Sequence, residues 1–183
     1  MEFIKTPVSG IFICKPIVYK DSRGYFFETF REKLLENFLE KKVNFCQDNE
    51  AFSAKGVLRG LHYQLAPHAQ AKLVRVASGK IMDVAVDMRK NSTTFGKHYS
   101  VELSEENKLQ LYIPEGFAHG YIALEDSVVI YKTDAYYNSG ADAGILYNDK
   151  DLMIDWKLKE KELIISEKDK KQPSFAEAIS MTD

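Results

Sequence analysis

The chain has 183 residues, of which 45% are hydrophobic and 28% charged, a length and composition typical of one folded domain and unlike a disordered or fibrous chain. Its formal net charge of -2 excludes the general basic field that attracts nucleic acid. No apolar run approaches the roughly 18 residues of a membrane span, and Lys5, Pro7 and Lys15 interrupt the stretch where a signal peptide needs an apolar core. We therefore expect one domain, residues 1–183, located in the cytoplasm and without nucleic-acid or membrane partners.

Strands dominate the predicted elements. Many of the 10 Tyr and 11 Phe residues lie beside Val and Ile in short alternating runs, a pattern that predicts a mainly β protein. In chain order, strands are expected over residues 11–19, 24–30, 57–63, 72–77, 80–88, 97–103, 109–113, 120–124 and 127–135. Ser78 and Gly79 predict a tight hairpin, because glycine readily adopts the positive φ of such turns. So many short strands indicate a sandwich, a jelly roll or a barrel.

Only two segments have a helical pattern, so a few short helices are expected. Residues 31–40 place their large apolar side chains on one stripe, and the tail after Ser166 begins with a capping-type serine followed by acidic residues. Residues 157–171 carry both signs of charge and are expected to form a solvated surface segment. Cys14 and Cys46 lie in apolar, strand-like settings that favour two buried thiols over a disulfide.

The predicted strand over residues 57–63 contains an unusual combination of polar residues and glycine. Strand alternation points Arg59 and His62 to opposite faces unless the chain bulges at Gly60. A glycine inside a strand is often found at a bulge or where a ligand approaches the backbone closely. A single histidine is just as compatible with an ordinary hydrogen-bonded side chain, so this pattern alone does not establish a site.

The next predicted strand begins with a lysine that faces the wrong way for a surface residue. Lys72 shares a strand face with Val74 and Val76, which favour burial. Either its ammonium escapes to water along an apolar stem, or it lines a pocket and meets an anion. Asp83, on the inward face of the following strand, is a candidate partner.

Residues 114–120 are similar to the second motif of cupin barrels. Pro114 and Gly116 form a turn that delivers His119 to the start of the next strand. Metal-binding cupins also have an earlier His-x-His and a glutamate, because a transition metal needs about three or four N and O ligands. Here the corresponding earlier segment is His62-Tyr63-Gln64, in which a glutamine stands where the metal-binding cupins have their second histidine. We therefore expect a cupin-type jelly roll that works without metal; the competing interpretation, a metal cupin such as a dioxygenase, is distinguished by elemental analysis.

With these pieces in place, the whole chain resembles the dTDP-4-dehydrorhamnose 3,5-epimerases, which are small jelly-roll enzymes of sugar-nucleotide pathways. The resemblance depends on many separate motifs that occur in order and at fitting spacing. They are residues 21–24 with 27–28, 47–49, 57–64, 72–75, 83–89, 94–96, 113–120, 131–132 and 163–169.

The resemblance implies a role for each matching position. His62 corresponds to the general base, Asp169 to the aspartate that orients it, Lys72 to the lysine that stabilises the enolate, and Tyr131 to the proton donor on the opposite face of the sugar. Further substrate-binding positions are expected at Arg23, Glu28, Gln47, Asp48, Asn49, Arg59, His119, Asp142 and Lys168. Away from the family context, an ion pair between Arg23 and Glu28 is the simpler interpretation of those two residues.

These residue types suit the implied reaction. Epimerisation beside a ketone needs a base near neutrality, a fixed cation for the enolate oxygen and a protonated donor on the other face. The keto group itself activates the neighbouring protons, so no cofactor is expected. The resemblance also implies a dTDP-linked 4-keto-6-deoxyhexose as substrate and a homodimer that exchanges N-terminal strands. The alternatives are an epimerase that inverts one centre, C3 or C5, of a related nucleotide-linked sugar, and a non-catalytic jelly roll that binds a sugar nucleotide.

Overall fold

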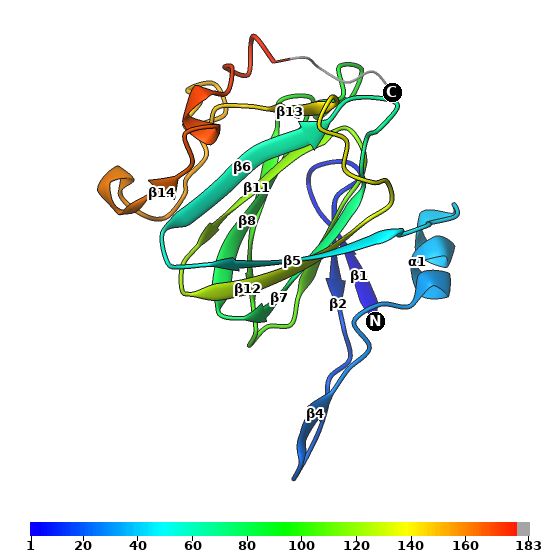
Figure 1. Ribbon diagram of the computed structural model, residues 1–183. Coiled ribbons are helices and arrows are strands. Elements are labelled where there is room, and N and C mark those ends of the chain that lie inside the picture. Colours follow the sequence, from blue (N-terminus) through cyan, green and yellow to red (C-terminus); the bar gives the residue numbers. More distant parts are fainter. Residues whose placement is uncertain (179–183) are drawn as a thin grey trace.

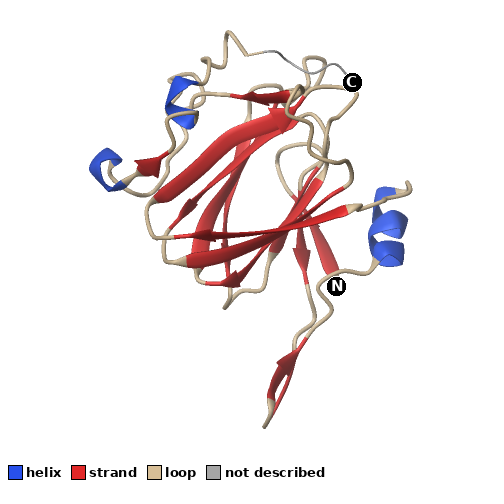
Figure 2. Cartoon of the chain, viewed as in Figure 1, coloured by secondary structure: helices blue, strands red, loops and turns tan. Residues whose placement is uncertain are grey.

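The computed structural model describes residues 1–178, which form mostly strands with a few short helices (Figure 2). The strands are β1 (Glu2–Lys5), β2 (Phe12–Lys15), β3 (Tyr19–Asp21), β4 (Gly24–Phe26), β5 (Gln47–Ser53), β6 (Val57–Gln64), β7 (Lys72–Ser78), β8 (Lys80–Asp87), β9 (His98–Ser104), β10 (Gln110–Ile113), β11 (Phe117–Ala123), β12 (Ser127–Thr133), β13 (Asp142–Gly144) and β14 (Ile164–Ile165). The helices are α1 (Glu32–Leu39) and two 3-10 turns, η1 (Glu160–Glu162) and η2 (Asp169–Lys171).

The strands form two large sheets that face each other (Figure 1). The first sheet has the order β1-β2-β10-β7-β12-β5, and the second has the order β13-β6-β11-β8-β9 with β14 added to β6. Every pair along these two orders is antiparallel, and only β14 runs parallel to its neighbour. This arrangement is the predicted jelly-roll sandwich.

The inner faces of the two sheets share one hydrophobic core. Val74 and Val76 on β7 meet Ile81 and Ala85 on β8 within a single buried cluster. Strand alternation explains the match, because residues two apart point to the same face. The core fills one part of the space between the sheets and leaves a polar part, described below, for the site.

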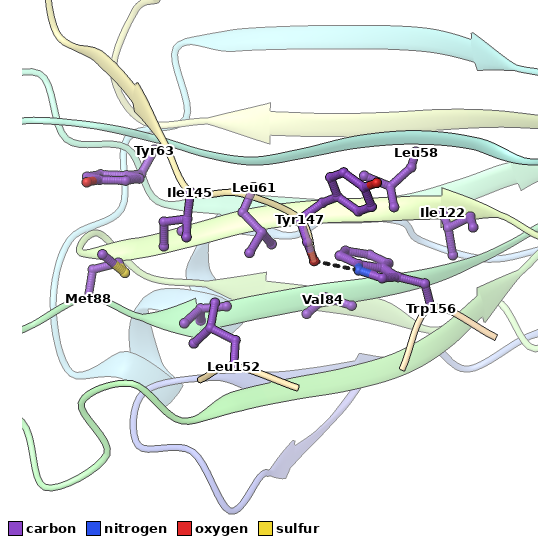
Figure 3. Packing of buried hydrophobic residues seen from close by; sticks show 12 residues of the cluster. Leu58, Leu61, Tyr63, Val84, Met88, Ile122, Ile145, Tyr147, Leu152 and Trp156 are labelled. Carbon is purple, nitrogen blue, oxygen red and sulfur yellow. Dashed lines mark hydrogen bonds between the residues drawn. The ribbon is translucent and has the colours of Figure 1, made fainter. Parts of the chain in front are cut away.

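Both sheets are also covered on their outer faces, so several strands are buried on two sides. On the second sheet, Leu58, Leu61 and other apolar side chains pack under the chain that follows β13 (Figure 3). In that cluster the Trp156 indole donates a hydrogen bond of 2.8 Å to the Tyr147 carbonyl, so its polar atom is satisfied inside the core. On the first sheet, α1 covers a cluster that includes Leu35.

A two-stranded arm made of β3 and β4 projects from the sandwich (Figure 1). Tyr19, Tyr25 and Phe26 on this arm are more than half exposed. The arm is attached to the body through Lys108, whose ammonium donates a 2.9 Å hydrogen bond to the Tyr25 hydroxyl and lies 4.3 Å from the centre of its ring. The hairpin therefore leaves three large aromatic side chains exposed.

Several sequence expectations differ from the structure. Strands β1, β5, β13 and β14 were not predicted, and as far as residue 178 the tail after Ser166 forms the short η2 helix followed by turns and irregular chain. Residues 157–171 are not simply a solvated segment, because β14 pairs with β6 and Asp169 is buried. Polar sequence conceals β5, because its inward residues Gln47 and Asn49 lie on the side where Ala51 lines the cavity and not the apolar core.

Two further observations concern the cysteines and the helices. Both cysteines are free; Cys14 is buried, and burial raises the pKa of its thiol to about 12, whereas Cys46 is half-buried. Among the described residues, no helix is long and apolar enough to cross a membrane.

Candidate active site

A cavity with two lobes opens between the sheets. The larger lobe has a volume of about 530 Å³ and the smaller one about 170 Å³. The residues that line both lobes are His62, Lys72, Tyr131 and Lys168. Because strands of both sheets and the segment around β14 supply the walls, a ligand in this cavity is contacted from opposite sides.

A bulge in β6 places Arg59 and His62 on the same wall. His62 pairs with His119 and Arg59 pairs with Tyr121, so β6 has one residue more than β11 over this stretch. Gly60 at the bulge has φ +120, and a Cβ there would lie 2.5 Å from the Gly120 Cα. Only glycine therefore fits at this point, and the condition set by the sequence, a bulge at Gly60, is met.

His62 forms a dyad with the buried Asp169. The His62 Nε2 donates to the Asp169 Oδ1 at 2.6 Å, and the Asp169 Oδ2 lies 3.5 Å from the Gly60 amide. Burial alone would raise the pKa of Asp169, but the hydrogen bond and charge of His62 outweigh it and hold that pKa below its ordinary value. Nδ1 has no partner among the described residues, so it is the ring atom able to accept a proton.

A second histidine lies directly beside the first. His119 on β11 is the cross-strand partner of His62, and its Nε2 donates to the Asp83 Oδ1 at 2.7 Å. The sequence suggested that Asp83 pairs with Lys72, but the direct contact is to His119. The carboxylate is fully buried and fixes the orientation of the His119 ring.

Lys72 points into the cavity, which decides between the two possibilities left open by the sequence. It is half-buried, and no carboxylate of the described residues lies within ion-pair distance of its ammonium. Burial lowers the pKa of Lys72 to about 8, against the opposing effects of Asp83 and Asp142. The lysine is thus a cation whose charge is available to a ligand.

Tyr131 lies on the wall opposite His62. It belongs to β12 of the first sheet, whereas His62 belongs to β6 of the second. Lys72 pairs with Thr133, two residues from Tyr131, so both side chains project from the same face of the first sheet. Burial raises the pKa of Tyr131, which keeps its hydroxyl protonated at neutral pH.

Polar groups at the rim are held by the protein itself. Arg59 donates from Nε to the Ser53 hydroxyl at 3.0 Å and from Nη2 to the Phe52 carbonyl at 3.1 Å. Lys168 forms an ion pair with Asp142 across the smaller lobe. These cations therefore meet an incoming anion with little reorganisation.

Not all predicted site residues lie in the cavity. Arg23 is on the projecting arm and pairs with Asp21, while Glu28 pairs with Arg31, so the ion pair between Arg23 and Glu28 does not form. Asp48 points to the outer face of β5, where its Oδ1 accepts from the Lys132 ammonium at 2.7 Å, and it does not line either lobe of the cavity.

Gln47 and Asn49 point inward from the alternate positions of β5. They bind each other at 2.7 Å, near Ala51, which lines the larger lobe.

The structure adds residues that sequence analysis missed. Tyr137, Gln64 and Gln70 line the smaller lobe, and Tyr121 lines the larger one. Gln64 belongs to the matched motif of residues 57–64. It could have been predicted to point into the cavity, because it lies two positions after His62 on the same strand. Tyr137 lies in a loop without periodicity, so only the resemblance could have indicated it.

Each of the two histidines is hydrogen-bonded to its own aspartate. The described residues contain no group of three or more His, Cys, Asp and Glu side chains that could hold a metal ion. The arrangement is suited instead to moving protons, with one oriented histidine facing a tyrosine and a lysine.

Comparison with known proteins gives full-length matches. A family model described as dTDP-4-dehydrorhamnose 3,5-epimerase matches residues 5–177. A dTDP-4-dehydrorhamnose 3,5-epimerase of Methanothermobacter thermautotrophicus is 53% identical over 92% of this chain and 91% of that protein. The crystal structure of such an enzyme from Elizabethkingia anophelis NUHP1 is 50% identical, with a TM-score of 0.93 over 96% of this chain and 97% of that one.

A ligand-bound structure is also similar. A dTDP-6-deoxy-D-glucose-3,5-epimerase from Legionella pneumophila, in complex with dTDP-4-keto-L-rhamnose, is 43% identical, with a TM-score of 0.92 over 96% of this chain and 93% of that one. The matches therefore include every element that lines the cavity.

Proposed function

The chain belongs to the dTDP-4-dehydrorhamnose 3,5-epimerase family, and we propose that it binds its nucleotide sugar in the cavity between the two sheets and epimerises it with His62, Lys72 and Tyr131. It is an isomerase of dTDP-L-rhamnose biosynthesis, which confirms the resemblance found in the sequence. The substrate is dTDP-4-dehydro-6-deoxy-D-glucose and the product dTDP-4-dehydro-L-rhamnose.

The observation that carries the proposed mechanism is the placement of a base and an acid on opposite walls. His62 Nδ1 takes the proton from a carbon beside the keto group. The C–H electron pair forms a double bond between that carbon and C4, and the π electrons of the C4 carbonyl move onto its oxygen, which gives an enolate. Lys72 stabilises the negative charge on the C4 oxygen, and Asp169 stabilises the imidazolium. Tyr131 then delivers a proton to the same carbon from the other face, which inverts the centre. The imidazolium then releases its proton to solvent and the tyrosinate takes one up from solvent, after which the steps are repeated at the second carbon.

The cations at the rim suit the diphosphate of the nucleotide. Arg59 offers a planar guanidinium that can contact two phosphate oxygens, and Lys168 adds a second charge. His119 adds a ring N–H or acceptor beside the reacting carbons. A non-catalytic binding protein has no use for a proton donor and acceptor on opposite walls.

Deuterium incorporation tests the function directly. NMR of the purified enzyme with dTDP-4-dehydro-6-deoxyglucose in deuterated water should show exchange at both C3 and C5 without added metal. Exchange at one carbon only would indicate an epimerase that inverts a single centre. No exchange at either carbon would contradict the proposal and leave another substrate or a binding role.

Replacing Tyr131 with phenylalanine should separate the two halves of the reaction. Because the hydroxyl acts only in reprotonation, exchange of substrate protons should fall much less than formation of the L-sugar, which should drop by about 10²-fold or more. Both rates are measured in one NMR time course. Equal losses of the two rates would contradict the assignment of Tyr131 as donor.

We also propose that two copies of the chain form a homodimer in which each arm serves the partner's cavity. Arg23 and Glu28 are matched to the substrate-binding motif, yet they lie on or beside the arm and outside their own subunit's cavity. The exposed aromatic side chains Tyr25 and Phe26 on the same hairpin support a covered surface.

Mixed dimers test this assignment of the arm. Arg23→Ala and His62→Ala are each expected to be poorly active alone. In a mixed dimer, the His62→Ala subunit lends its intact arm to the Arg23→Ala subunit, so co-expression should restore about a quarter of the wild-type rate. No restoration in dimers verified by native mass spectrometry would show that each arm serves its own cavity.

The remaining expectations follow from this function. We propose that the chain is one domain that works in the cytoplasm without metal or cofactor and binds no nucleic acid. Elemental analysis of the purified protein is the test, and a metal bound in stoichiometric amount that is needed for exchange would contradict it.

A further inference from the structure

The loop between β12 and β13 carries Tyr137 at the mouth of the smaller lobe, but apolar packing does little to hold it. Tyr136 and Tyr137 are 69% and 60% exposed, and the following residues up to Gly140 are polar or glycine. A loop with so little buried apolar surface keeps one position only if hydrogen bonds fix its backbone.

Gln64, the last residue of β6, supplies those hydrogen bonds. It is 5% exposed, and its amide oxygen accepts from the Asn138 amide at 2.7 Å. Its amide nitrogen donates to the Tyr136 carbonyl at 3.3 Å and to the His68 carbonyl at 2.6 Å. One buried side chain thus binds the peptide groups on both sides of Tyr137.

The Tyr137 side chain links this loop to the charged groups of the site. Its hydroxyl donates to the Asp142 Oδ2 at 3.3 Å, and the same oxygen accepts from the Lys168 ammonium. Tyr137 lines the smaller lobe together with Lys72 and Tyr131. Any displacement of the loop therefore moves an aromatic ring that lines the lobe and breaks its hydrogen bond to the carboxylate that pairs with Lys168.

We propose that Gln64 is a positioning residue for substrate binding, which acts through Tyr137 by fixing the backbone on both sides of it. The inference rests on the proposed function, because Tyr137 contacts substrate only if the cavity takes the nucleotide sugar. Gln64 contacts none of the reacting atoms in this role. It should therefore determine how tightly the substrate is held and not how fast the bound substrate reacts.

The variant Gln64→Met tests the proposal, because methionine keeps the length of the side chain but can replace none of the three hydrogen bonds. KM should rise about tenfold while kcat for exchange at C3 and C5 stays within about twofold of wild type. In the unliganded protein, the Asn138 amide should lose its protection from hydrogen exchange. A slow Asn138 amide, or a fall in kcat with KM unchanged, would overturn the proposal.

A double-mutant cycle shows whether the effect passes through Tyr137. In a Tyr137→Ala background, Gln64→Met should raise KM no further, and an undiminished tenfold rise there would overturn the proposal. Leu152→Val, at a buried position in the cluster on the outer face of the second sheet, controls for lowered stability and should leave KM unchanged. Failure of the proposed function is distinct, because the wild-type enzyme itself would then show no exchange.

Discussion

Replacing His62 with alanine is expected to abolish exchange of the C3 and C5 protons with deuterated water. His62 is oriented by Asp169 and is the base in the proposed mechanism. His119 lies beside it and is oriented in the same way by Asp83, but it is buried and lines only the larger lobe, whereas His62 is half-buried and lines both. General-base catalysis contributes about 10²–10⁴-fold, so a loss of that size is expected in the exchange rate measured by NMR.

Binding should survive the same substitution. The groups expected to hold the nucleotide do not depend on His62 for their position; Arg59, for example, is held by the Phe52 carbonyl. Calorimetry should therefore give an affinity for dTDP close to that of the wild type. Asp169→Asn is the matched control, since it keeps the size of the side chain but withdraws the charge that stabilises the imidazolium, and it should be intermediate in rate. Exchange retained in His62→Ala would refute the assignment of the base.

Lys72→Met should lower kcat/KM by about 10²–10³-fold, the loss usual when a group that stabilises a developing oxyanion is removed. Methionine keeps the unbranched apolar stem, so packing against the wall of the cavity is preserved. Exchange and product formation should fall together, because both need the enolate. This pattern differs from Tyr131→Phe, in which product formation should fall more.

The pH dependence of the wild type gives a second readout for Lys72. Its pKa is lowered to about 8 by burial, so the ammonium is charged below that pH and loses its proton above it. The wild-type kcat/KM should therefore decline as pH rises through about 8. Lys72→Met has no group to titrate and should lack this decline. An alkaline limb of the same position in the variant would assign the limb to another group.

The inner strands could be predicted from sequence because both of their faces are buried. On β8, for example, Ile81 and Ala85 face the core between the sheets and Val84 faces the outer cluster. Apolar residues therefore occur at nearly every position of the strand, which makes it easy to recognise in the sequence. The α1 helix was also predictable, since its apolar stripe covers the first sheet. In these places hydrophobicity reports burial directly.

Elements that border the cavity were hidden from the same analysis. On β5, Gln47 and Asn49 point inward where a core strand would have apolar side chains, and Phe52 points outward and is 62% exposed. Hydrophobic alternation is reversed there because the inner side is a binding site. For the same reason, the segment with Asp169 had the composition of a surface and only the resemblance indicated its role.

The place of individual site residues was predictable to a different degree. The sequence showed that Arg59 and His62 can share a face only if β6 bulges at Gly60, but whether it bulges depends on the pairing of β6 with β11, which the sequence does not reveal. The separation of Arg23 from its own cavity could not be foreseen, because it depends on the direction of the arm.

The dyad joins two residues that are 107 positions apart in the chain, and this has a consequence for the timing of synthesis. A ribosome adds about 5–20 residues per second, so Asp169 is joined to the nascent chain roughly 5–20 s after His62. Strands β7 to β14 are made in that interval, while the histidine still lacks its carboxylate. A chain that ends before residue 169 therefore has no complete dyad and, like Asp169→Asn, is expected to exchange substrate protons more slowly than the full chain.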